Sequence, residues 1–379
     1  MSYFQDPRAL AKIDVAALAA NFISLHTYAA RAVNGAKPPR TIAVVKANAY
    51  GHGTAQAVPA FSRAGCDFFA VATLEEAIEV RLLAPVADIL ILGYTPPRRA
   101  ADLARYDLTQ TVFSSEYALE LSKNATVLGV FVKTHLKIDS GMCRLGFSPQ
   151  CVDQIAAAAA QQNLAPWGIY THFPSADTDL PTTRAALSRF LHCRQALSVR
   201  GFSLFAHAAA SAALLRLPEA VLDGARVGLA LYGIAPVPCT LGLTPALTLT
   251  APIVQIREVP AGTQVGYGGT FVTARPSRIG TVPIGYGDGV PRRFREAVGR
   301  VCVRCKSGVF FAPVAGNICM DQMMLDLTGI PAEVGDLTEP LGDIPTTAAA
   351  LDTIPYEILT SIKQRVPRIK KRPPQDSGR

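Results

Sequence analysis

The chain has 379 residues, of which 49% are hydrophobic and 17% charged, and it carries a formal net charge of +8. This composition indicates a globular α/β protein of two or three domains and excludes a disordered chain. The positive charge is spread without a basic recognition helix, no apolar run is long enough to cross a bilayer, and no signal peptide is evident. We therefore expect a cytoplasmic protein with neither a nucleic-acid nor a membrane partner.

The eight cysteines are scattered along the chain. A chain of this length does not need a disulfide scaffold. Cys302 and Cys305 form one Cys-x-x-Cys pair without a second pair, so we expect no zinc site and assign no metal ligands.

After a short first strand at residues 11–15 and a helix at 15–31, apolar strands alternate with helical segments. The strands are expected at residues 41–45, 67–72, 89–92, 109–113, 130–139, 167–172, 202–207 and 225–231. Thr73 and Glu76 form a capping-box pattern at the start of one intervening helix. Strands that alternate with helices indicate a parallel sheet, and eight repeats favour a closed β/α barrel of the TIM type over an open doubly wound sheet.

From about residue 247 the helical periodicity ends and short strands alternate with Gly and Pro turns. Strands are expected at residues 253–259, 278–284, 298–303 and 323–327, followed by a helix at 355–364 and a frayed basic tail from 365. We therefore assign residues 1–240 to the barrel, with a first strand that could join the β domain, and 241–379 to a C-terminal all-β domain with a final helix and the tail.

Lys46 ends the apolar strand at residues 41–45 and precedes a turn that contains Tyr50 and two glycines. Burial at such a position favours the neutral amine, which is the form that reacts with a carbonyl cofactor. The plain alternative is a lysine that marks where a strand reaches the surface.

Four more polar residues fall near the carboxyl ends of the expected strands, which is where barrels of this type build their sites. With Lys46 they form a set of five: Lys46, Lys137, His172, His207 and Arg226. Each has an ordinary structural explanation, but five at one end of a barrel favour a site. One lysine for an aldehyde, with Ser211 and Gly228 near the last two strands for a phosphate, fits pyridoxal phosphate chemistry.

These residues stand in motifs that resemble those of alanine racemases over nearly the whole chain. The matching stretches are residues 43–53 (AVVKANAYGHG), 137–146 (KIDSGMCRLG), 170–173 (YTHF), 226–233 (RVGLALYG), 284–289 (IGYGDG), 319–322 (CMDQ) and 355–357 (PYE). The resemblance implies a pyridoxal 5'-phosphate enzyme of the barrel fold type that interconverts L- and D-alanine and supplies D-alanine for peptidoglycan. It also implies two catalytic bases: Lys46, which binds the cofactor and serves the D-face, and Tyr267 on the L-face.

The resemblance assigns further roles by motif. The residues implied to bind the cofactor are Lys46, Tyr50, His172, Ser211, Arg226, Gly228 and Tyr356. Arg226 is implied to meet the pyridine nitrogen, where related decarboxylases carry a carboxylate. The residues implied to bind substrate are Arg144, Met320 and Tyr286, and those implied to support the site are Lys137, His207, Asp177 and Arg292. Lys137 matches a lysine that is carbamylated in many members.

The resemblance further implies a head-to-tail homodimer with shared active sites. Tyr267, Tyr286 and Met320 would come from the partner subunit, and Asp177 and Arg292 would line the entryway from opposite subunits.

Three positions depart from the usual family pattern. Ala210 replaces an Asn, Gly266 replaces a Ser, and Ser140 replaces a Thr. These changes put cofactor affinity and turnover in question more than the type of reaction. The alternatives are a racemase of broader specificity, a barrel-type decarboxylase and a non-enzymatic pyridoxal-phosphate-binding protein. Arg226 argues against the decarboxylase, and the β domain with Tyr267 argues against the binding protein.

Overall fold

The computed structural model describes residues 8–33 and 38–371. These residues form two compact units that interleave in the sequence. One unit comprises Ala16–Ala49 and Ala57–Thr244. The other comprises the described residues up to Val15, Tyr50–Gln56, and the described chain from Pro245 onward. The chain therefore leaves the first unit after Ala49 and returns to it at Ala57.

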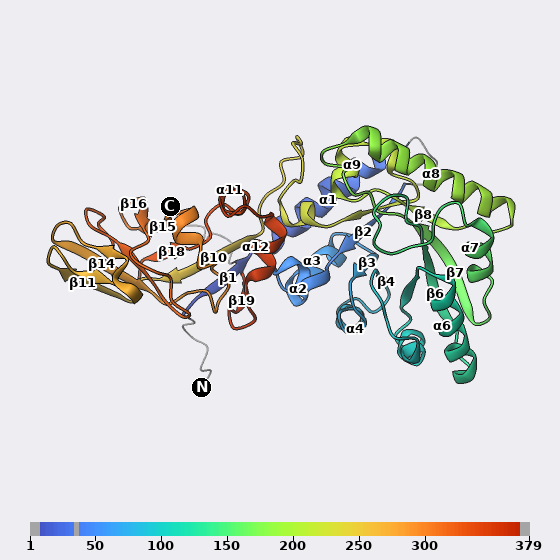
Figure 1. Cartoon of the computed structure of the whole chain (residues 1–379), viewed down its shortest axis with the longest axis horizontal. Helices are drawn as coiled ribbons and strands as arrows, with labels where there is room; N and C mark the ends of the chain where they lie inside the picture. Colours follow the sequence, from blue (N-terminus) through green and yellow to red (C-terminus); the bar gives the residue numbers. More distant parts are fainter. Residues whose placement is uncertain (1–7, 34–37, 372–379) are drawn as a thin grey trace, which may run out of the picture. The chain divides into compact units, whose positions relative to one another are not determined.

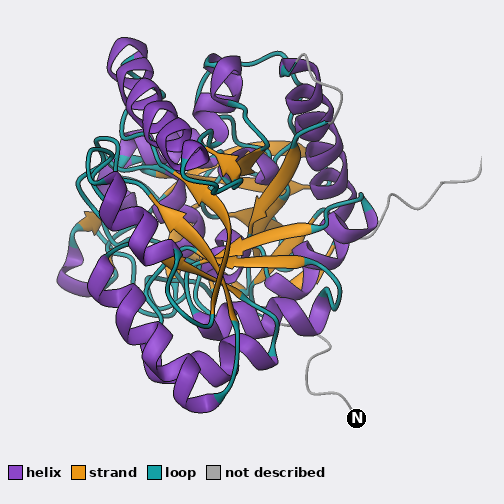
Figure 2. Ribbon diagram, turned by 90° about the vertical axis from the view of Figure 1, so that its right-hand side faces the viewer, coloured by secondary structure: helices purple, strands orange, loops and turns teal. Residues whose placement is uncertain are grey.

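The first unit is built on a closed barrel of eight parallel strands within the described residues, which confirms the predicted fold. Each strand pairs with the next in the sequence, and the last pairs with the first, Ile42 opposite Arg226. Figure 2 shows the helices arranged around these strands. The strands are β2 (Arg40–Val44), β3 (Phe68–Val71), β4 (Asp88–Ile91), β5 (Thr109–Val112), β6 (Val132–Lys137), β7 (Leu164–Tyr170), β8 (Phe205–His207) and β9 (Gly224–Val227).

The outer helices begin and end at local sequence signals. Thr73 and Glu76 form the predicted capping box of α4 (Leu74–Leu83). Ser114 caps α6 (Ser115–Leu128), which stops at Gly129 in the left-handed conformation that glycine adopts readily. Asp179 caps α8 (Leu180–Val199). The remaining helices of this part are α1 (Val15–Ala32), α2 (Lys46–Tyr50), α3 (Thr54–Arg63), α5 (Ala100–Arg105), α7 (Val152–Ala159) and α9 (Ser211–Arg216).

The second unit contains a six-stranded sheet in the order β16-β15-β18-β10-β1-β19. Its strands are β16 (Gly308–Pro313), β15 (Arg300–Cys305), β18 (Leu337–Glu339), β10 (Leu247–Pro252), β1 (Leu10–Ile13) and β19 (Arg368–Lys370). A three-stranded sheet of β11 (Gln255–Val259), β14 (Ser277–Val282) and β17 (Met323–Asp326) and a ribbon of β12 (Gln264–Val265) and β13 (Phe271–Val272) complete it. The first strand of the chain thus pairs with strands of the C-terminal part (Figure 1).

Two expectations for this unit are corrected. The described part of this unit contains the α-helices α10 (Phe294–Ala297), α11 (Ile344–Ala350) and α12 (Pro355–Ser361), and only α12 corresponds to an expected helix. The basic segment is not a frayed end over its described part: β19 pairs with β1 in parallel, Ile369 opposite Lys12. Arg372, the last residue of that run, lies outside the described residues. Among the described residues, no helix combines the length and apolar character needed to cross a bilayer.

Candidate active site

Two predicted residues of the barrel, Lys137 and His207, lie at one level of neighbouring strands with Tyr170 between them. Lys137 on β6 pairs with Tyr170 on β7, and Tyr170 pairs with His207 on β8. The ring of His207 stacks on that of Tyr170, with the centroids 4.8 Å apart. Lys46 and His172 follow the ends of β2 and β7. Because all eight strands are parallel, these positions belong to the same carboxyl end of the barrel.

Arg226 on β9 is a buried cation with a dense set of acceptors. It donates to His207 Nδ1 at 2.8 Å and to the carbonyls of His207, Thr171 and Ala208 at 2.9, 2.6 and 3.1 Å. Burial lowers the pKa of Arg226 to about 10, so the guanidinium remains charged at neutral pH. None of the ion pairs among the described residues includes Arg226, so carbonyls and imidazole stabilise this charge in place of a carboxylate.

The bond to Arg226 fixes the protonation of two buried histidines. An arginine can only donate, so His207 Nδ1 is the acceptor and His207 Nε2 carries the proton. His207 Nε2 lies 3.0 Å from Nδ1 of His135, which therefore accepts. Burial and the nearby Arg226 charge lower the pKa of His207 far below its usual range and that of His135 to about 3. Both imidazoles are neutral and serve as a fixed support for the guanidinium.

Lys137 is a buried lysine poised between its two protonation states. Burial, together with the charges of Arg226 and Arg144, lowers its pKa to about 7, although Asp139 acts in the opposite direction. Its Nζ donates to the carbonyl of Ile138 at 2.9 Å. A large fraction of Lys137 is therefore a neutral amine near pH 7, which makes it nucleophilic.

Lys46 opens an unusual turn instead of ending the strand. Ala47, Asn48, Ala49 and Tyr50 all have φ between +52° and +53°, a left-handed turn without glycine. For such residues this conformation costs about 1–2 kcal/mol each, so surrounding contacts must hold it. Burial and the Arg144 charge lower the pKa of the half-buried Lys46, and the carboxylate of Glu76 opposes them.

The side chain of Glu76 stabilises the start of this turn. Its Oε1 accepts a hydrogen bond from the N–H of Ala47 at 2.7 Å, and its Oε2 accepts from Ala72 and Thr73 at 2.8 and 3.3 Å. The capping-box glutamate of α4 thus reaches across to the strand end that carries Lys46. The Glu76 side chain therefore caps the helix, stabilises the left-handed turn and raises the pKa of Lys46.

The variant Glu76→Gln tests this link. It removes the charge that raises the pKa of Lys46, so that pKa should fall further and the neutral amine should appear at lower pH. We expect the reaction of the apoprotein with pyridoxal phosphate to shift to lower pH. Replacing a charged acceptor should also lower the free energy of unfolding by about 1.5 kcal/mol.

Glu79→Gln is the matched control, because Glu79 is an exposed residue of the same helix. The rate of pyridoxal phosphate attachment is measured against pH for both variants and the wild type. An equal shift in the two variants, or none in Glu76→Gln, would contradict the role of Glu76.

Donors suited to a phosphate lie near the last two strands. The hydroxyl of Ser211, at the start of α9, accepts a hydrogen bond from the N–H of Gly228 at 3.0 Å. Ala210, which stands in place of the usual Asn, precedes α9 and provides no side-chain cap. Ser140, which stands in place of the usual Thr, forms a hydrogen bond with Thr171 in which the two hydroxyl oxygens are 2.7 Å apart.

Tyr50 and Tyr356 approach each other in the second unit, with ring centroids 5.8 Å apart. Burial raises the pKa of Tyr50, so it remains a protonated hydroxyl. The backbone is tightly packed here, since a Cβ on Gly51 would lie 2.1 Å from the carbonyl oxygen of Leu359. Tyr50 and Gly51 are therefore packed against α12, which carries Tyr356.

Arg144 follows a loop organised by Asp139. The Asp139 carboxylate accepts hydrogen bonds from the N–H groups of Gly141, Met142 and Arg144 at 2.7–2.9 Å. Burial alone would raise the pKa of Asp139, but these donors bring it below its ordinary value. The exposed Arg144 side chain is left available for a carboxylate.

The other predicted residues are exposed. Tyr267 is 75% exposed, Met320 53% and Tyr286 41%, and all three belong to the second unit. Gly266, the noted departure, has φ +74°, and the carbonyl of the following Tyr267 accepts from Asn317 Nδ2 at 2.9 Å. Asp177, in the barrel unit, and Arg292, in the second unit, are also exposed.

His135 and Tyr170 are not among the site residues expected from the sequence, and Glu76 is expected there only as a helix cap. His135 and Lys137 are two residues apart on β6, a spacing that places them on one face of a strand. The same spacing relates Tyr170 to His172. This period of two was the available signal for both, whereas nothing local to Glu76 indicates its bond to Ala47.

Comparisons with known proteins agree with this geometry. Family models of the alanine racemase N-terminal and C-terminal domains match residues 13–236 and 246–370. An alanine racemase of Carboxydothermus hydrogenoformans is 40% identical over 88% of this chain and 93% of that protein. The alanine racemase of a D-cycloserine-producing Streptomyces lavendulae has a TM-score of 0.86 at 34% identity, over 97% of this chain and 98% of that one. The Bacillus anthracis alanine racemase with bound L-Ala-P has a TM-score of 0.86 at 31% identity, over 97% and 96%.

Proposed function

Because this chain belongs to the alanine racemase family of amino-acid racemases, we propose that it interconverts L- and D-alanine with pyridoxal 5'-phosphate and supplies D-alanine for peptidoglycan. The observation that carries the proposal is the buried Arg226 held by neutral His207. A permanent cation that can only donate suits an unprotonated pyridine nitrogen, where the decarboxylase alternative needs a carboxylate. Arg226 as the partner of the pyridine nitrogen therefore supports racemisation over decarboxylation.

The chemistry of the donor set fits this cofactor. Its aldehyde needs a neutral amine, and Lys46 has a lowered pKa. Its phosphate needs N–H and hydroxyl donors, and Ser211 and Gly228 lie together at the ends of the last two strands. Tyr50 and Tyr356 add two hydroxyls to the proposed phosphate ligands. His172, whose pKa burial and Arg226 lower to about 3, is a neutral ring suited to lie against the pyridine.

Bound pyridoxal phosphate supplies an electron sink that weakens the Cα–H bond of the attached amino acid. The protein must then remove a proton from one face and deliver one to the other. Lys46 Nζ holds the proton of the D-face, and the Tyr267 hydroxyl holds that of the L-face. Arg226, which can only donate hydrogen bonds, would leave the ring nitrogen of bound pyridoxal phosphate unprotonated. This would weaken the electron sink and limit side reactions of the substrate.

Substrate recognition is assigned to Arg144, Met320 and Tyr286. The Arg144 guanidinium and the Met320 N–H bind the substrate carboxylate, while Tyr286 and Tyr356 limit the space for its side chain. A pocket restricted to a methyl group favours alanine over the alternative of a broader-specificity racemase.

Lys137 has the chemistry needed for carbamylation. Its pKa of about 7 provides the neutral amine that attacks carbon dioxide. A C–N bond forms, one proton is released to solvent, and the resulting carbamate carries a negative charge beside the arginines. We therefore propose that the carbamate of Lys137 orients Arg144.

A homodimer completes the site in this proposal. The exposure of Tyr267, Tyr286 and Met320 supports their contribution to the site of a second subunit. An isologous arrangement then gives two equivalent sites per dimer. Asp177 and Arg292, both exposed, line the entrance from opposite subunits.

Subunit mixing tests this sharing. Lys46→Ala and Tyr267→Phe should each be inactive alone, but a mixed dimer should contain one site with both native bases. Random exchange makes half of the dimers mixed, so we expect about one quarter of wild-type activity. Activity is measured after the inactive variants are mixed, dissociated and reassociated, with each variant treated alone as the control. No recovery from dimers shown to be mixed would contradict shared sites.

Assays of the purified protein with L- and D-alanine test the proposed function. Optical rotation should decay to zero from either enantiomer, because both reactions end at the same mixture of L- and D-alanine. L-Serine and bulkier amino acids, assayed in parallel, separate alanine specificity from the broader alternative. Rapid release of carbon dioxide, or no racemisation of alanine with pyridoxal phosphate present, would overturn the proposal.

A further inference from the structure

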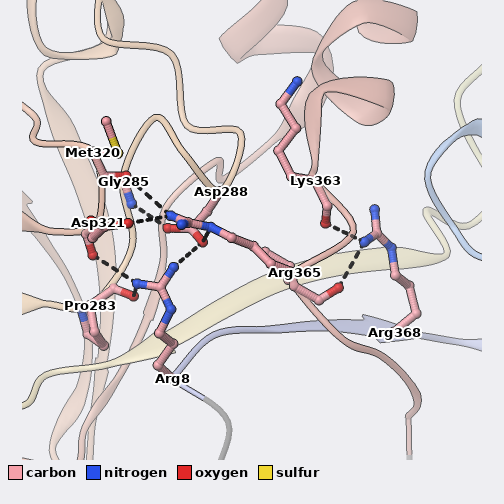
Figure 3. Close-up of polar contacts among 10 residues, drawn as sticks. Arg8, Pro283, Gly285, Asp288, Met320, Asp321, Lys363, Arg365 and Arg368 are labelled. Atoms are coloured by element: carbon pink, nitrogen blue, oxygen red, sulfur yellow. Dashed lines mark hydrogen bonds and ion pairs between the residues drawn. The ribbon is translucent and has the colours of Figure 1, made fainter.

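Asp288 is a buried carboxylate in the second unit to which the proposed mechanism gives no role. Its side chain is 1% exposed and makes ion pairs with both Arg8 and Arg365, the latter at 2.7 Å (Figure 3). Its second oxygen accepts a hydrogen bond from the N–H of Gly285 at 2.9 Å. A buried carboxylate is costly unless it is fully paired, and Asp288 is paired on both oxygens.

The two arginines connect the turn at residues 283–289, which contains Asp288, to a second turn at residues 319–321. Arg365 Nη2 bonds Asp321 Oδ1 at 2.6 Å and the Met320 carbonyl at 3.4 Å. Arg8 Nη1 donates to the carbonyls of Asp321 and Pro283 at 3.1 and 3.2 Å. Figure 3 shows both guanidinium groups directed toward Asp288 and Asp321. The cluster therefore bridges residues 283–289, which include Tyr286, and residues 319–321, which include Met320.

The two turns also meet directly and closely. The N–H of Tyr286 donates to the Cys319 carbonyl at 3.1 Å, and that of Gly287 donates to the Met320 carbonyl at 2.8 Å. A Cβ on Gly285 would lie 2.1 Å from the Cys319 oxygen. The turns are thus fitted backbone to backbone, and a shift of one displaces the other.

A third segment is fastened to the same carboxylate residue. The N–H of Lys363 donates to the Asp288 carbonyl at 3.0 Å, and the Ser361 hydroxyl donates to the Gly289 carbonyl at 2.9 Å. Ser361 ends α12, which carries Tyr356. One buried residue therefore connects the backbones that carry Tyr286, Met320 and Tyr356.

The side chains of Tyr286 and Met320 are 41% and 53% exposed, so their own packing fixes them weakly. Their positions depend instead on the backbone turns that the cluster holds. We propose that Asp288 and Arg365, with Arg8, are positioning residues that set the substrate affinity and side-chain selectivity of the site, an inference that rests on the proposed function. They act through Tyr286 and Met320 and contact no reacting atom.

The test compares Asp288→Asn with the conservative Arg365→Lys. Asp288→Asn keeps the side-chain size but removes the ion pairs, so we expect KM for alanine to rise about tenfold and kcat to change less than threefold. The ratio of L-serine to L-alanine turnover should rise at least threefold, because the pocket is no longer held narrow. Arg365→Lys keeps the charge and should lie between wild type and Asp288→Asn on both measures.

Arg304→Gln is the matched control. Arg304 forms an ion pair with Glu339 between β15 and β18 of the same unit, and neither residue belongs to the two turns. This variant should retain wild-type KM and selectivity. Arg8→Gln breaks only one arm of the cluster, so it keeps the proposal testable where Asp288→Asn does not fold, and it should raise KM about threefold.

Melting temperature and pyridoxal phosphate content are measured with the kinetics. A lower melting temperature with unchanged KM and selectivity in Arg8→Gln and Arg365→Lys would reduce the cluster to a structural role and overturn the inference. A decrease of kcat in these variants without a change in KM or selectivity would also overturn the inference. An inactive wild type would instead overturn the proposed function, which keeps the two failures distinct.

Discussion

Lys46→Ala is expected to lose both covalent attachment of pyridoxal phosphate and essentially all racemisation. Lys46 has an amine whose pKa is lowered by burial and by Arg144, at the carboxyl end of the barrel. Loss of a general base alone costs about 10²–10⁴-fold in rate, and this variant also loses the attachment point, so we expect a decrease of about 10⁴-fold or more.

The attachment site is measured independently of activity. Borohydride reduction fixes the cofactor to its lysine, and mass spectrometry of the digested protein identifies the modified peptide. Lys133→Ala is the control, because Lys133 lies on the barrel strand β6 in an exposed ion pair with Asp107. It should retain the label and the activity. A stoichiometric label on another lysine of the wild-type protein would refute the assignment of Lys46.

Tyr267→Phe is expected to retain the cofactor and lose racemisation by about 10²–10⁴-fold, because one face of the substrate loses its proton carrier. Lys46 remains, so the loss should differ between the two faces. In D₂O, the Cα hydrogen of D-alanine should still exchange with solvent, whereas that of L-alanine should not. NMR of the recovered amino acids measures both exchange rates.

Tyr94→Phe provides the control for a tyrosine hydroxyl removed elsewhere, since Tyr94 is 57% exposed in the barrel unit. It should racemise alanine at the wild-type rate. Wild-type racemisation by Tyr267→Phe, or equal exchange of both enantiomers in it, would refute the two-base assignment.

Much of the fold could be predicted because its signals are local. The strands of the barrel are short apolar runs separated by helices, and the helix after β3 begins at the capping box of Thr73 and Glu76. Parallel strands bring their carboxyl ends together, so Lys46, Lys137, His172, His207 and Arg226 could be grouped from their positions in the chain. Motif resemblance then added Tyr267 and the residues of the second unit, whose roles remain predictions.

The error at the basic segment has a physical cause that is not local. The basic run at 365–372 predicts a frayed end, because a charged run has no local partner. In the structure Arg365 pairs with Asp288, and Ile369 lies opposite Lys12 of β1. Such contacts join residues that are far apart in sequence, and no local pattern records them. The helix α11 lies between the expected strands and the helix expected at 355–364, in a stretch for which no element is expected. Its start does carry a local signal, because Asp343 caps it.

The sequence by itself determined the barrel, the change near residue 247 from alternating strands and helices to short strands, and the identity of the polar residues at the strand ends. These features depend on local propensity and periodicity. Only the tertiary structure decided the state of those residues. Alanine favours the right-handed helix, yet Ala47 and Ala49 are left-handed beside Glu76. Burial and proximity, which exist only in the fold, make His207 neutral, bring the pKa of Lys137 near 7 and fasten the Tyr286 and Met320 turns to one carboxylate.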